Sequence, residues 1–183
     1  MAGESEPCCS AALAGLAQLC PLFGRTEASG TRTSLSAKKL NFVVDNRGKI
    51  RDHYALNTDK LGAGSYGSVC KAEHKASKSQ RAIKTISKAQ TGKTQKAQER
   101  LEAEIDIMKS MDHPGIIKLY ETFEDKQNIY LVMEICGGGE LFDRIVEAGH
   151  FSETDAAIVM QQMIGSIYYM HKNNVCHRDL KPE

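Results

Sequence analysis

The chain has 183 residues, of which 41% are hydrophobic and 26% charged, and its formal net charge is +1. These values are typical of one globular domain with an additional segment. A near-neutral chain lacks the basic footprint of nucleic-acid-binding proteins, so no nucleic-acid partner is expected. None of the six cysteines forms a CxxC pair, which argues against a zinc or redox site and favours a reducing, cytoplasmic compartment.

Residues 1–40 differ in composition from the rest of the chain. The stretch 8–24 is rich in alanine and leucine, and the stretch 24–39 is small, polar and basic. The apolar part is shorter than the ~20 residues that a membrane-spanning helix needs. Acidic Glu4 and Glu6 stand where a secretory signal carries positive charge. We expect a disordered extension, with targeting as the alternative, and a route to membrane association through acylation of Cys8, Cys9 or Cys20.

A folded domain is predicted from about residue 42 onward. Residues 41–53 are a lead-in segment, in which residues 45–48 resemble the start of an EF-hand loop but lack its acidic spacing and are interpreted as a turn. Short β-prone runs bounded by turn-forming residues then predict three strands. They cover residues 54–61, 68–73 and 80–86.

An amphipathic helix is predicted over residues 93–111, because Leu101, Ile105 and Met108 recur at helical spacing. Pro114 ends it, since proline disfavours helix at the residue before it. Residues 116–123 and 128–134 then predict a β-hairpin.

The chain turns helical again after the glycines at 137–139. Residues 152–155 resemble a capping box that opens a long helix running to about Lys172. The apolar face of this helix needs further helices that the 183 residues do not contain, so we expect it to be exposed. We divide the chain into residues 1–40, 41–53, 54–136 and 137–183.

A glycine-rich run lies between the first two predicted strands. It matches G-x-G-x-x-G-x-V, and glycines let a backbone approach phosphate oxygens closely. A dinucleotide-binding fold would place a helix directly after the glycines, whereas a strand follows here, which makes an NAD-type domain remote. The run consists of Gly62, Ala63, Gly64, Ser65, Tyr66, Gly67, Ser68 and Val69.

Lys84 ends the third predicted strand, where a lysine costs desolvation free energy unless it is paired, and an edge lysine that reaches solvent is the alternative. Glu104 flanks the buried stripe of the following helix, and an ion pair between the two would hold the ammonium against the phosphates of a nucleotide. Glu102 is the competing partner, but the spacing to Met111 favours Glu104.

Residues 130–136 form a strand that runs straight into glycines. Backbone groups there suit a flat base, with an acceptor from Glu134 and a donor from Cys136. Met133 would border the base and Glu140 would bond a ribose hydroxyl. Core packing of Met133 and a helix-start role for Glu140 remain the alternatives.

The last residues carry the most specific motif. The run H-R-D-L-K-P-E, residues 177–183, matches the start of the catalytic loop of protein kinases. Asp179 would accept the proton of a substrate hydroxyl, and Lys181 would neutralise charge on the γ-phosphate.

From about residue 54 to its end the chain resembles the eukaryotic serine/threonine protein kinase family. The run LVMEICGGGELFDRI within it is most similar to calcium-dependent protein kinases. The resemblance implies an α+β fold, with a small lobe of a five-stranded antiparallel sheet and one long helix, followed by the first helices of a large lobe. The adenine and phosphate contacts that it implies include Leu61, Val69, Ala82 and Lys84 besides the glycine loop and hinge residues.

The resemblance also implies cofactors and partners. ATP and Mg²⁺ are the expected cofactors, although the Mg²⁺ ligands of the family follow Glu183 and are not among these residues. The implied partner is a protein substrate with basic residues near its Ser or Thr, contacted by Glu140 and Glu183. A calcium-binding module is expected only in a longer form. We therefore expect a kinase fragment with little activity of its own, and a non-catalytic nucleotide- or partner-binding half-domain is the alternative.

Overall fold

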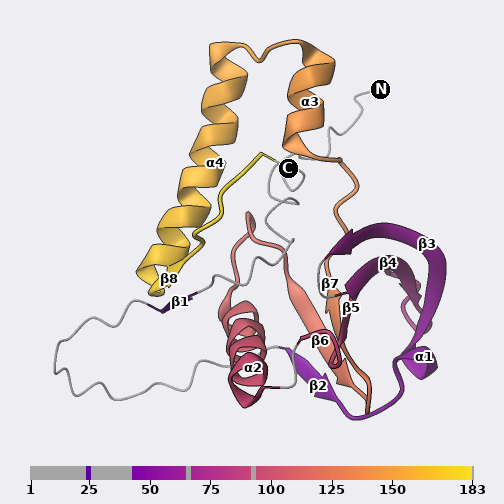
Figure 1. The fold of residues 1–183 in the computed structure, drawn as a ribbon. Helices are drawn as coiled ribbons and strands as arrows, with labels where there is room; N and C mark the ends of the chain where they lie inside the picture. The colour runs from indigo at the N-terminus through magenta and orange to yellow at the C-terminus, as the bar shows by residue number, and fades with distance from the viewer. Residues whose placement is uncertain (1–23, 26–42, 65–66, 92–93, 183) are drawn as a thin grey trace, which may run out of the picture. The chain divides into compact units, whose positions relative to one another are not determined.

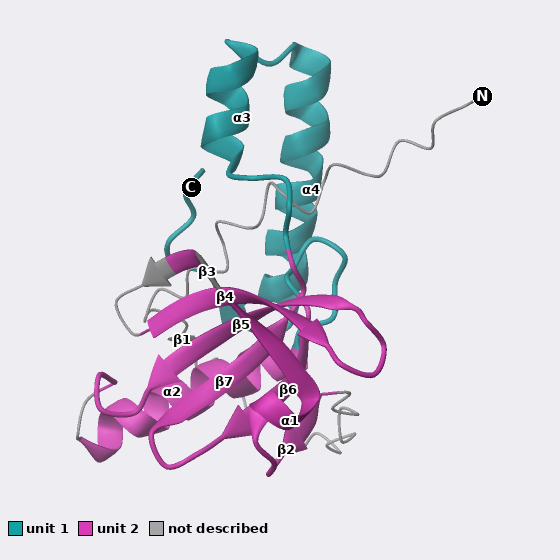
Figure 2. Ribbon diagram, turned by 90° about the vertical axis from the view of Figure 1, so that its right-hand side faces the viewer, with its two compact units in different colours: residues 1–39, 111–117, 136–183 teal, residues 40–110, 118–135 magenta. Residues whose placement is uncertain are grey.

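The structure is a computed structural model that describes residues 24–25, 43–64, 67–91 and 94–182. The chain divides into two compact units (Figure 2), one of residues 40–110 and 118–135 and the other of residues 1–39, 111–117 and 136–183. Several residues singled out above lie outside the described residues. They are Glu4, Glu6, Cys8, Cys9, Cys20, Ser65, Tyr66 and Glu183.

A six-stranded sheet forms most of the first unit, in the order β2-β6-β7-β5-β4-β3. Five of its strands are antiparallel neighbours and confirm the predicted sheet. The strands are β2 Val44–Asn46, β3 Tyr54–Gly64, β4 Gly67–His74, β5 Gln80–Ser87, β6 Leu119–Glu124 and β7 Asn128–Met133.

The sixth strand, β2, corrects two predictions: the sheet does not stop at five strands, and Asp45 and Asn46 do not lie in a turn. β2 pairs in parallel with β6, with Asp45 opposite Thr122. Without it β6 would be an edge strand with unpaired backbone groups. Asn46 adds a side-chain hydrogen bond, donated from its Nδ2 to Glu121 Oε2 at 3.0 Å. A strand of three residues with exposed Val44 and Asp45 has too little apolar alternation to be predicted.

One face of the sheet carries the main hydrophobic core, which the short helix α1, Ile50–His53, completes. The core centres on Phe123, which is 1% exposed and meets the Tyr54 ring edge-on at 6.1 Å between centroids. Edge-to-face pairs of this kind are favourable beyond the area they bury. The core residues are Ile50, Tyr54, Ala72, Ile83, Phe123 and Val132.

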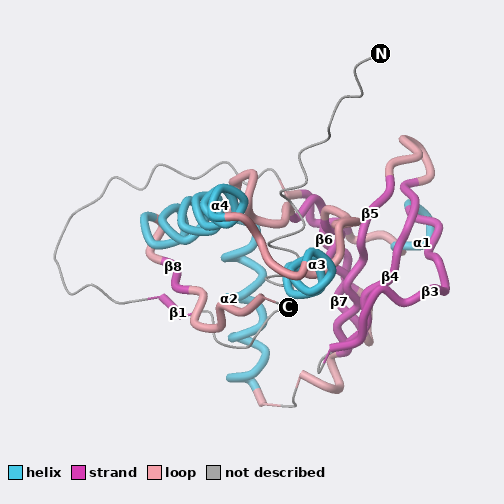
Figure 3. The backbone as a smooth tube through the Cα atoms, turned by 90° about the horizontal axis from the view of Figure 1, so that it is seen from above, coloured by secondary structure: helices cyan, strands magenta, loops and turns pink. Residues whose placement is uncertain are grey.

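Helix α2, Gln95–Ser110, lies along the other face of the sheet (Figures 1 and 3). Of the predicted stripe, Ile105 is buried, while Leu101 and Met108 are half-buried. Ile107 is also buried, which the 3.6-residue periodicity did not predict. The helix ends before Pro114, as expected.

The second unit contains α3, Leu141–Ala148, and α4, Glu153–Lys172, with a short antiparallel pair of β1, Gly24–Arg25, and β8, Val175–Cys176. The predicted cap is confirmed, because the Ser152 hydroxyl accepts a hydrogen bond from the Asp155 backbone N–H at 3.1 Å. β1 lies within the segment predicted as an extension, and the remainder of residues 1–40 is outside the described residues.

The segment 111–117 packs on α4 within this unit. The His113 and Tyr169 rings lie 5.0 Å apart, and the Ser166 hydroxyl donates to the Gly115 carbonyl at 3.3 Å. These contacts explain why Ser166, a polar residue, is fully buried.

Large apolar side chains on α3 and α4 are exposed, as the sequence predicted for α4. Tyr168 is 67% exposed and Val146 62%. No helix within the described part of the chain has the length and apolarity to cross a membrane.

Candidate nucleotide-binding site

The glycine loop and the predicted phosphate-binding lysine occupy one row across the sheet. Gly62 of β3 lies opposite Val69 of β4, and Val69 lies opposite Lys84 of β5. Cross-strand partners present their side chains on the same face, so Val69 and Lys84 share the face along which α2 lies. The sheet therefore brings three of the predicted contact residues together in one row.

A second cross-strand pair joins two predicted adenine contacts. Ala82 lies opposite Met133, and both are buried, at 7% and 3% exposure. Ala82 is two residues before Lys84, so it lies on the same face of the sheet as that lysine. Leu61, by contrast, is 55% exposed. Both predicted adenine contacts therefore lie on the face of the sheet that carries Lys84.

Lys84 is an almost fully buried cation, 9% exposed. Burial lowers its pKa from 10.5 to about 8, and the charge of Glu104 acts in the opposite direction. Burial raises the pKa of Glu104, which the charge of Lys84 lowers in turn. Desolvation of both groups exceeds their attraction, as is usual for a buried pair without direct contact.

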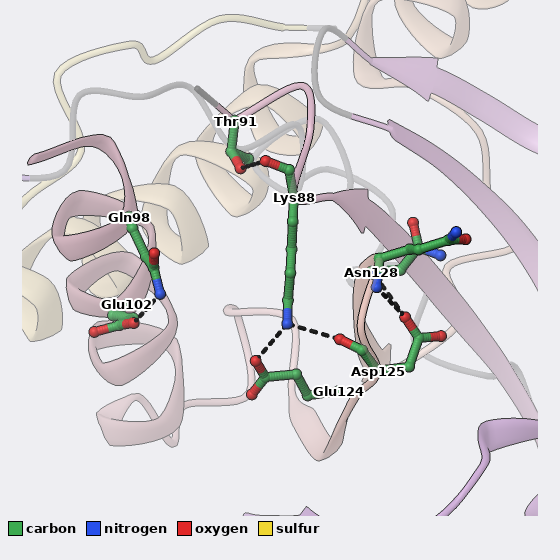
Figure 4. A network of polar contacts seen from close by, with 8 residues as sticks. Lys88, Thr91, Gln98, Glu102, Glu124, Asp125 and Asn128 are labelled. Carbon is green, nitrogen blue, oxygen red and sulfur yellow. Dashed lines mark hydrogen bonds and ion pairs between the residues drawn. The ribbon is translucent and has the colours of Figure 1, made fainter. Parts of the chain in front are cut away.

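The predicted pairing of Lys84 with Glu104 is electrostatic in this structure. Between these two described residues there is no direct ion pair, so the ammonium is left for an anionic ligand to approach. Glu102, the competing partner, is exposed and accepts a hydrogen bond from Gln98 at 3.2 Å within α2 (Figure 4). The geometry thus favours Glu104 over Glu102 as the charge that acts on Lys84.

Glycine is required at residue 67, because a side chain there would clash with the neighbouring strand. A Cβ added at this residue would lie 1.7 Å from the Thr85 carbonyl oxygen of β5, whereas one added at Gly62 would meet nothing within 4 Å. Thr85 is the residue directly after Lys84, so the close approach of β4 and β5 fixes the lysine next to the glycine loop.

We expect Gly67→Ala to cost about 1–3 kcal/mol of unfolding free energy, because the clash is with backbone that must shift. Gly62→Ala is the matched control and should change the unfolding free energy by less than about 0.5 kcal/mol. Urea-induced unfolding of the two variants measures the difference. Equal stability of the two variants would contradict the close approach at Gly67.

The predicted hinge residues follow directly on the end of β7. The Glu134 backbone N–H donates to the Lys118 carbonyl at 2.9 Å, which leaves the Glu134 carbonyl as the group that the base-acceptor prediction needs. The boundary between the two units falls after Ile135, within this segment. Cys136 and Glu140 are half-buried, and Glu140 caps α3 through its backbone without a side-chain capping bond.

The predicted catalytic loop, in the second unit, contains a hydrogen bond from the backbone to a histidine side chain. The buried His177 accepts from the Asp179 backbone N–H through Nδ1 at 3.2 Å. Arg178 between them has a φ of 65°, a left-handed conformation that few non-glycine residues adopt. Burial lowers the pKa of His177, and the charge of Asp179 acts to raise it. His177 therefore positions Asp179, a role that its place in the sequence motif did not reveal.

The end of the loop is attached to α3. The Phe142 backbone N–H donates to the Pro182 carbonyl at 3.0 Å, which satisfies one of the free N–H groups of the first helical turn. Lys181, the residue before, is exposed, and Asp179 is half-buried. Within its unit the structure thus ties the loop to the helix that Glu140 begins.

The described residues contain no group of three or more His, Cys, Asp and Glu side chains that could hold a metal ion. The residues of the Lys84 row suit the phosphates of a nucleotide.

Comparison with known proteins agrees with these features. The protein kinase domain family matches residues 56–183. The chain is 49% identical over 142 residues to calcium-dependent protein kinase 3 of Plasmodium yoelii yoelii, an alignment covering 78% of this chain and 26% of that protein. It is 51% identical over 141 residues to calcium-dependent protein kinase 5 of Plasmodium falciparum (isolate 3D7), covering 77% and 24%. With myosin light chain kinase A of Dictyostelium discoideum it shares 45% identity over 125 residues, covering 68% and 42%.

The chain belongs to the protein kinase family. Its most similar reported relatives include calcium-dependent protein kinases, as the residues of the hinge region predicted. The chain spans about a quarter of the length of these two relatives.

Proposed function

We propose that this chain is the ATP-binding part of a serine/threonine protein kinase that transfers the γ-phosphoryl group of Mg-ATP to a protein hydroxyl. The supporting observation is the buried Lys84, which shares a row with the glycine loop and has the charge of Glu104 nearby without a direct ion pair. A buried ammonium without a direct partner is costly, and an anionic ligand offsets that cost. Triphosphate is an anion suited to both the lysine and the loop.

Each residue has one part in the proposed reaction. Lys84 binds the α- and β-phosphates, and Asp179 accepts the proton of the attacking hydroxyl. Lys181 neutralises charge on the γ-phosphate. Mg²⁺, when bound with ATP, supplies the further neutralisation that phosphoryl transfer requires.

We also propose a preference for substrates with basic residues near the Ser or Thr, through Glu140 and Glu183. Support comes from Glu140, whose carboxylate is not used to cap α3. Membrane association by acylation of Cys8, Cys9 or Cys20, cytoplasmic residence, and a calcium-binding module in a longer form are parts of the same proposal.

Residues 1–183 alone are expected to transfer little or no phosphate. The 183 residues include neither the Asn that follows this motif in the family nor a D-F-G aspartate, the two Mg²⁺ ligands of protein kinases. Incubation with labelled ATP, Mg²⁺ and a basic peptide measures the transfer, with Lys84→Met as the background. Steady transfer well above that background would contradict this expectation.

ATP binding tests the proposed function itself. Calorimetric titration of residues 1–183 with ATP should show saturable binding that Lys84→Met removes, and titration with NAD should show none. ATP binding that survives Lys84→Met, or no binding at all, would instead favour a non-catalytic half-domain that binds a protein partner.

A further inference from the structure

The short strand β2 is joined to helix α2 by a side chain. Asp45 Oδ1 lies 2.7 Å from Lys109 Nζ, near the end of α2, and the same oxygen accepts a hydrogen bond from the Thr122 hydroxyl of β6. One carboxylate oxygen therefore connects the lead-in segment, the sheet and the helix. We call these three residues, Asp45, Lys109 and Thr122, the lead-in clamp.

Burial within the clamp is unequal. The side chain of Lys109 is 12% exposed and Thr122 is 8% exposed, whereas the side chain of Asp45 is 65% exposed. A nearly buried ammonium needs an anion, and Asp45 supplies it. Burial alone would raise the pKa of Asp45, but hydrogen bonds from Lys109 and Thr122 hold it below its ordinary value.

The lead-in clamp contains the ion pair of Asp45 with Lys109, which joins α2 to the sheet. Across residues 43–64, 67–91 and 94–182, no other ion pair joins this helix to a strand. Gln95 and Gln98 donate instead to Glu99 and Glu102, within α2 itself.

A groove of about 780 Å³, open to solvent, lies beside the clamp. Leu101 and Ile105 of α2 line it on the helix side, and Ile129 of β7 lines it on the sheet side. Along this groove the facing side chains do not contact one another, so they contribute less dispersion attraction between the helix and the sheet. The position of α2 over the sheet therefore depends more on the clamp than it would over a filled core.

We propose that Asp45 is a positioning residue: by holding Lys109 against β6, the lead-in strand sets the placement of α2, and with it the distance of Glu104 from Lys84. This rests on the proposed function, because Glu104 matters to a nucleotide only through Lys84. A ligand or partner that displaces residues 44–46 would free α2 and weaken nucleotide binding.

Amide hydrogen exchange followed by mass spectrometry tests the clamp without any nucleotide. Asp45→Asn and Lys109→Met should each raise exchange in residues 95–110 by about two- to five-fold, the range set by the loss of a partly exposed ion pair of up to about 1 kcal/mol. The double variant should exchange no faster than the faster single variant, because both remove one interaction.

The control variant is Glu124→Gln. It breaks the ion pair of Lys88 with Glu124, 2.6 Å long, at the same end of the sheet but without a residue of α2 (Figure 4). Exchange in residues 95–110 should stay at the wild-type rate. Asp45→Glu should keep most of the protection, since it retains the carboxylate.

Binding of a fluorescent ATP analogue then tests the link to Lys84. Asp45→Asn should raise the dissociation constant of the analogue by up to about five-fold. The change in binding free energy cannot exceed the free energy of the contact that the substitution removes. If the analogue does not bind the wild type, the proposed function fails while the exchange result still decides the clamp. Unchanged exchange in residues 95–110 in both Asp45→Asn and Lys109→Met, or an equal rise in Glu124→Gln, would overturn the proposal.

Discussion

Replacing Lys84 with methionine is expected to abolish ATP binding and to stabilise the first unit at the same time. Methionine keeps the length and the apolar stem but removes a charge that is 9% exposed and forms no direct ion pair with another residue that the structure describes. The pKa of Lys84 falls from 10.5 to about 8 because burial disfavours its charged form. The fold therefore carries an unfavourable charge at pH 7, and its removal should add on the order of 1–3 kcal/mol to the unfolding free energy.

The pH dependence of this gain has a definite sign. A lysine whose folded-state pKa is depressed carries its full penalty below that pKa, about 8, and none above the unfolded value of 10.5. The difference in unfolding free energy between Lys84→Met and wild type should be largest below pH 8 and vanish near pH 10.5. ATP affinity of the wild type should fall over the same rise in pH, as the ammonium loses its proton.

Lys88→Met is the matched control for this prediction. Lys88 is about one third exposed and bonded to Glu124 and to the Asp125 carbonyl (Figure 4). Its replacement should leave ATP affinity unchanged and the unfolding free energy lowered by no more than about 1 kcal/mol. Thermal unfolding and ATP titration measure the stability and the ATP affinity of both variants. A Lys84→Met protein that is less stable than the wild type would contradict burial as the cause of the lowered Lys84 pKa.

Phe123→Ala is expected to lower the unfolding free energy of the first unit by about 3–5 kcal/mol. Phe123 is 1% exposed and touches both the Tyr54 and His53 rings, so alanine leaves a cavity lined by groups that cannot collapse into it. Such a loss is a large part of the 5–15 kcal/mol that stabilises a typical domain.

Phe142→Ala provides the comparison, because this ring on α3 is 52% exposed. Its removal should change stability by less than about 0.5 kcal/mol. Urea-induced unfolding followed by circular dichroism measures both variants. A Phe123→Ala protein as stable as Phe142→Ala would show that the core is not centred where the structure places it.

The regular elements of the first unit could be predicted because each carries a local signal. β5 and β7 are apolar-rich runs between turn residues, and in the second unit α4 likewise opens with the Ser152 cap that the sequence predicted. β2 carries no such signal, since its stability comes from pairing with β6, a partner far away in the sequence. Local patterns cannot report contacts of that kind.

The site shows the same division. Lys84 and the glycines could be selected because motif and spacing identify them, and the row from Gly62 to Lys84 follows once the strands pair. The contact of Asp45 with Lys109 could not be predicted from the sequence. An aspartate in the segment that precedes the first long strand and a lysine on a helix both have the pattern of ordinary surface residues. The steric need for glycine at residue 67 likewise depends on how closely β5 approaches β4, and a sequence motif does not give that distance.

Chemical labelling of Lys84 tests the central claim most directly. An adenosine analogue with a sulfonyl fluoride in place of the phosphates would react with a neutral amine beside the phosphate site: the S–N bond forms, fluoride leaves, and the amine proton passes to buffer. With a pKa of about 8, Lys84 has a larger neutral fraction at pH 8 than ordinary exposed lysines have. Peptide mapping should find the label on Lys84 and its loss in the presence of excess ATP. Label spread over other lysines, or label on Lys84 that ATP does not prevent, would contradict an ATP site at this position.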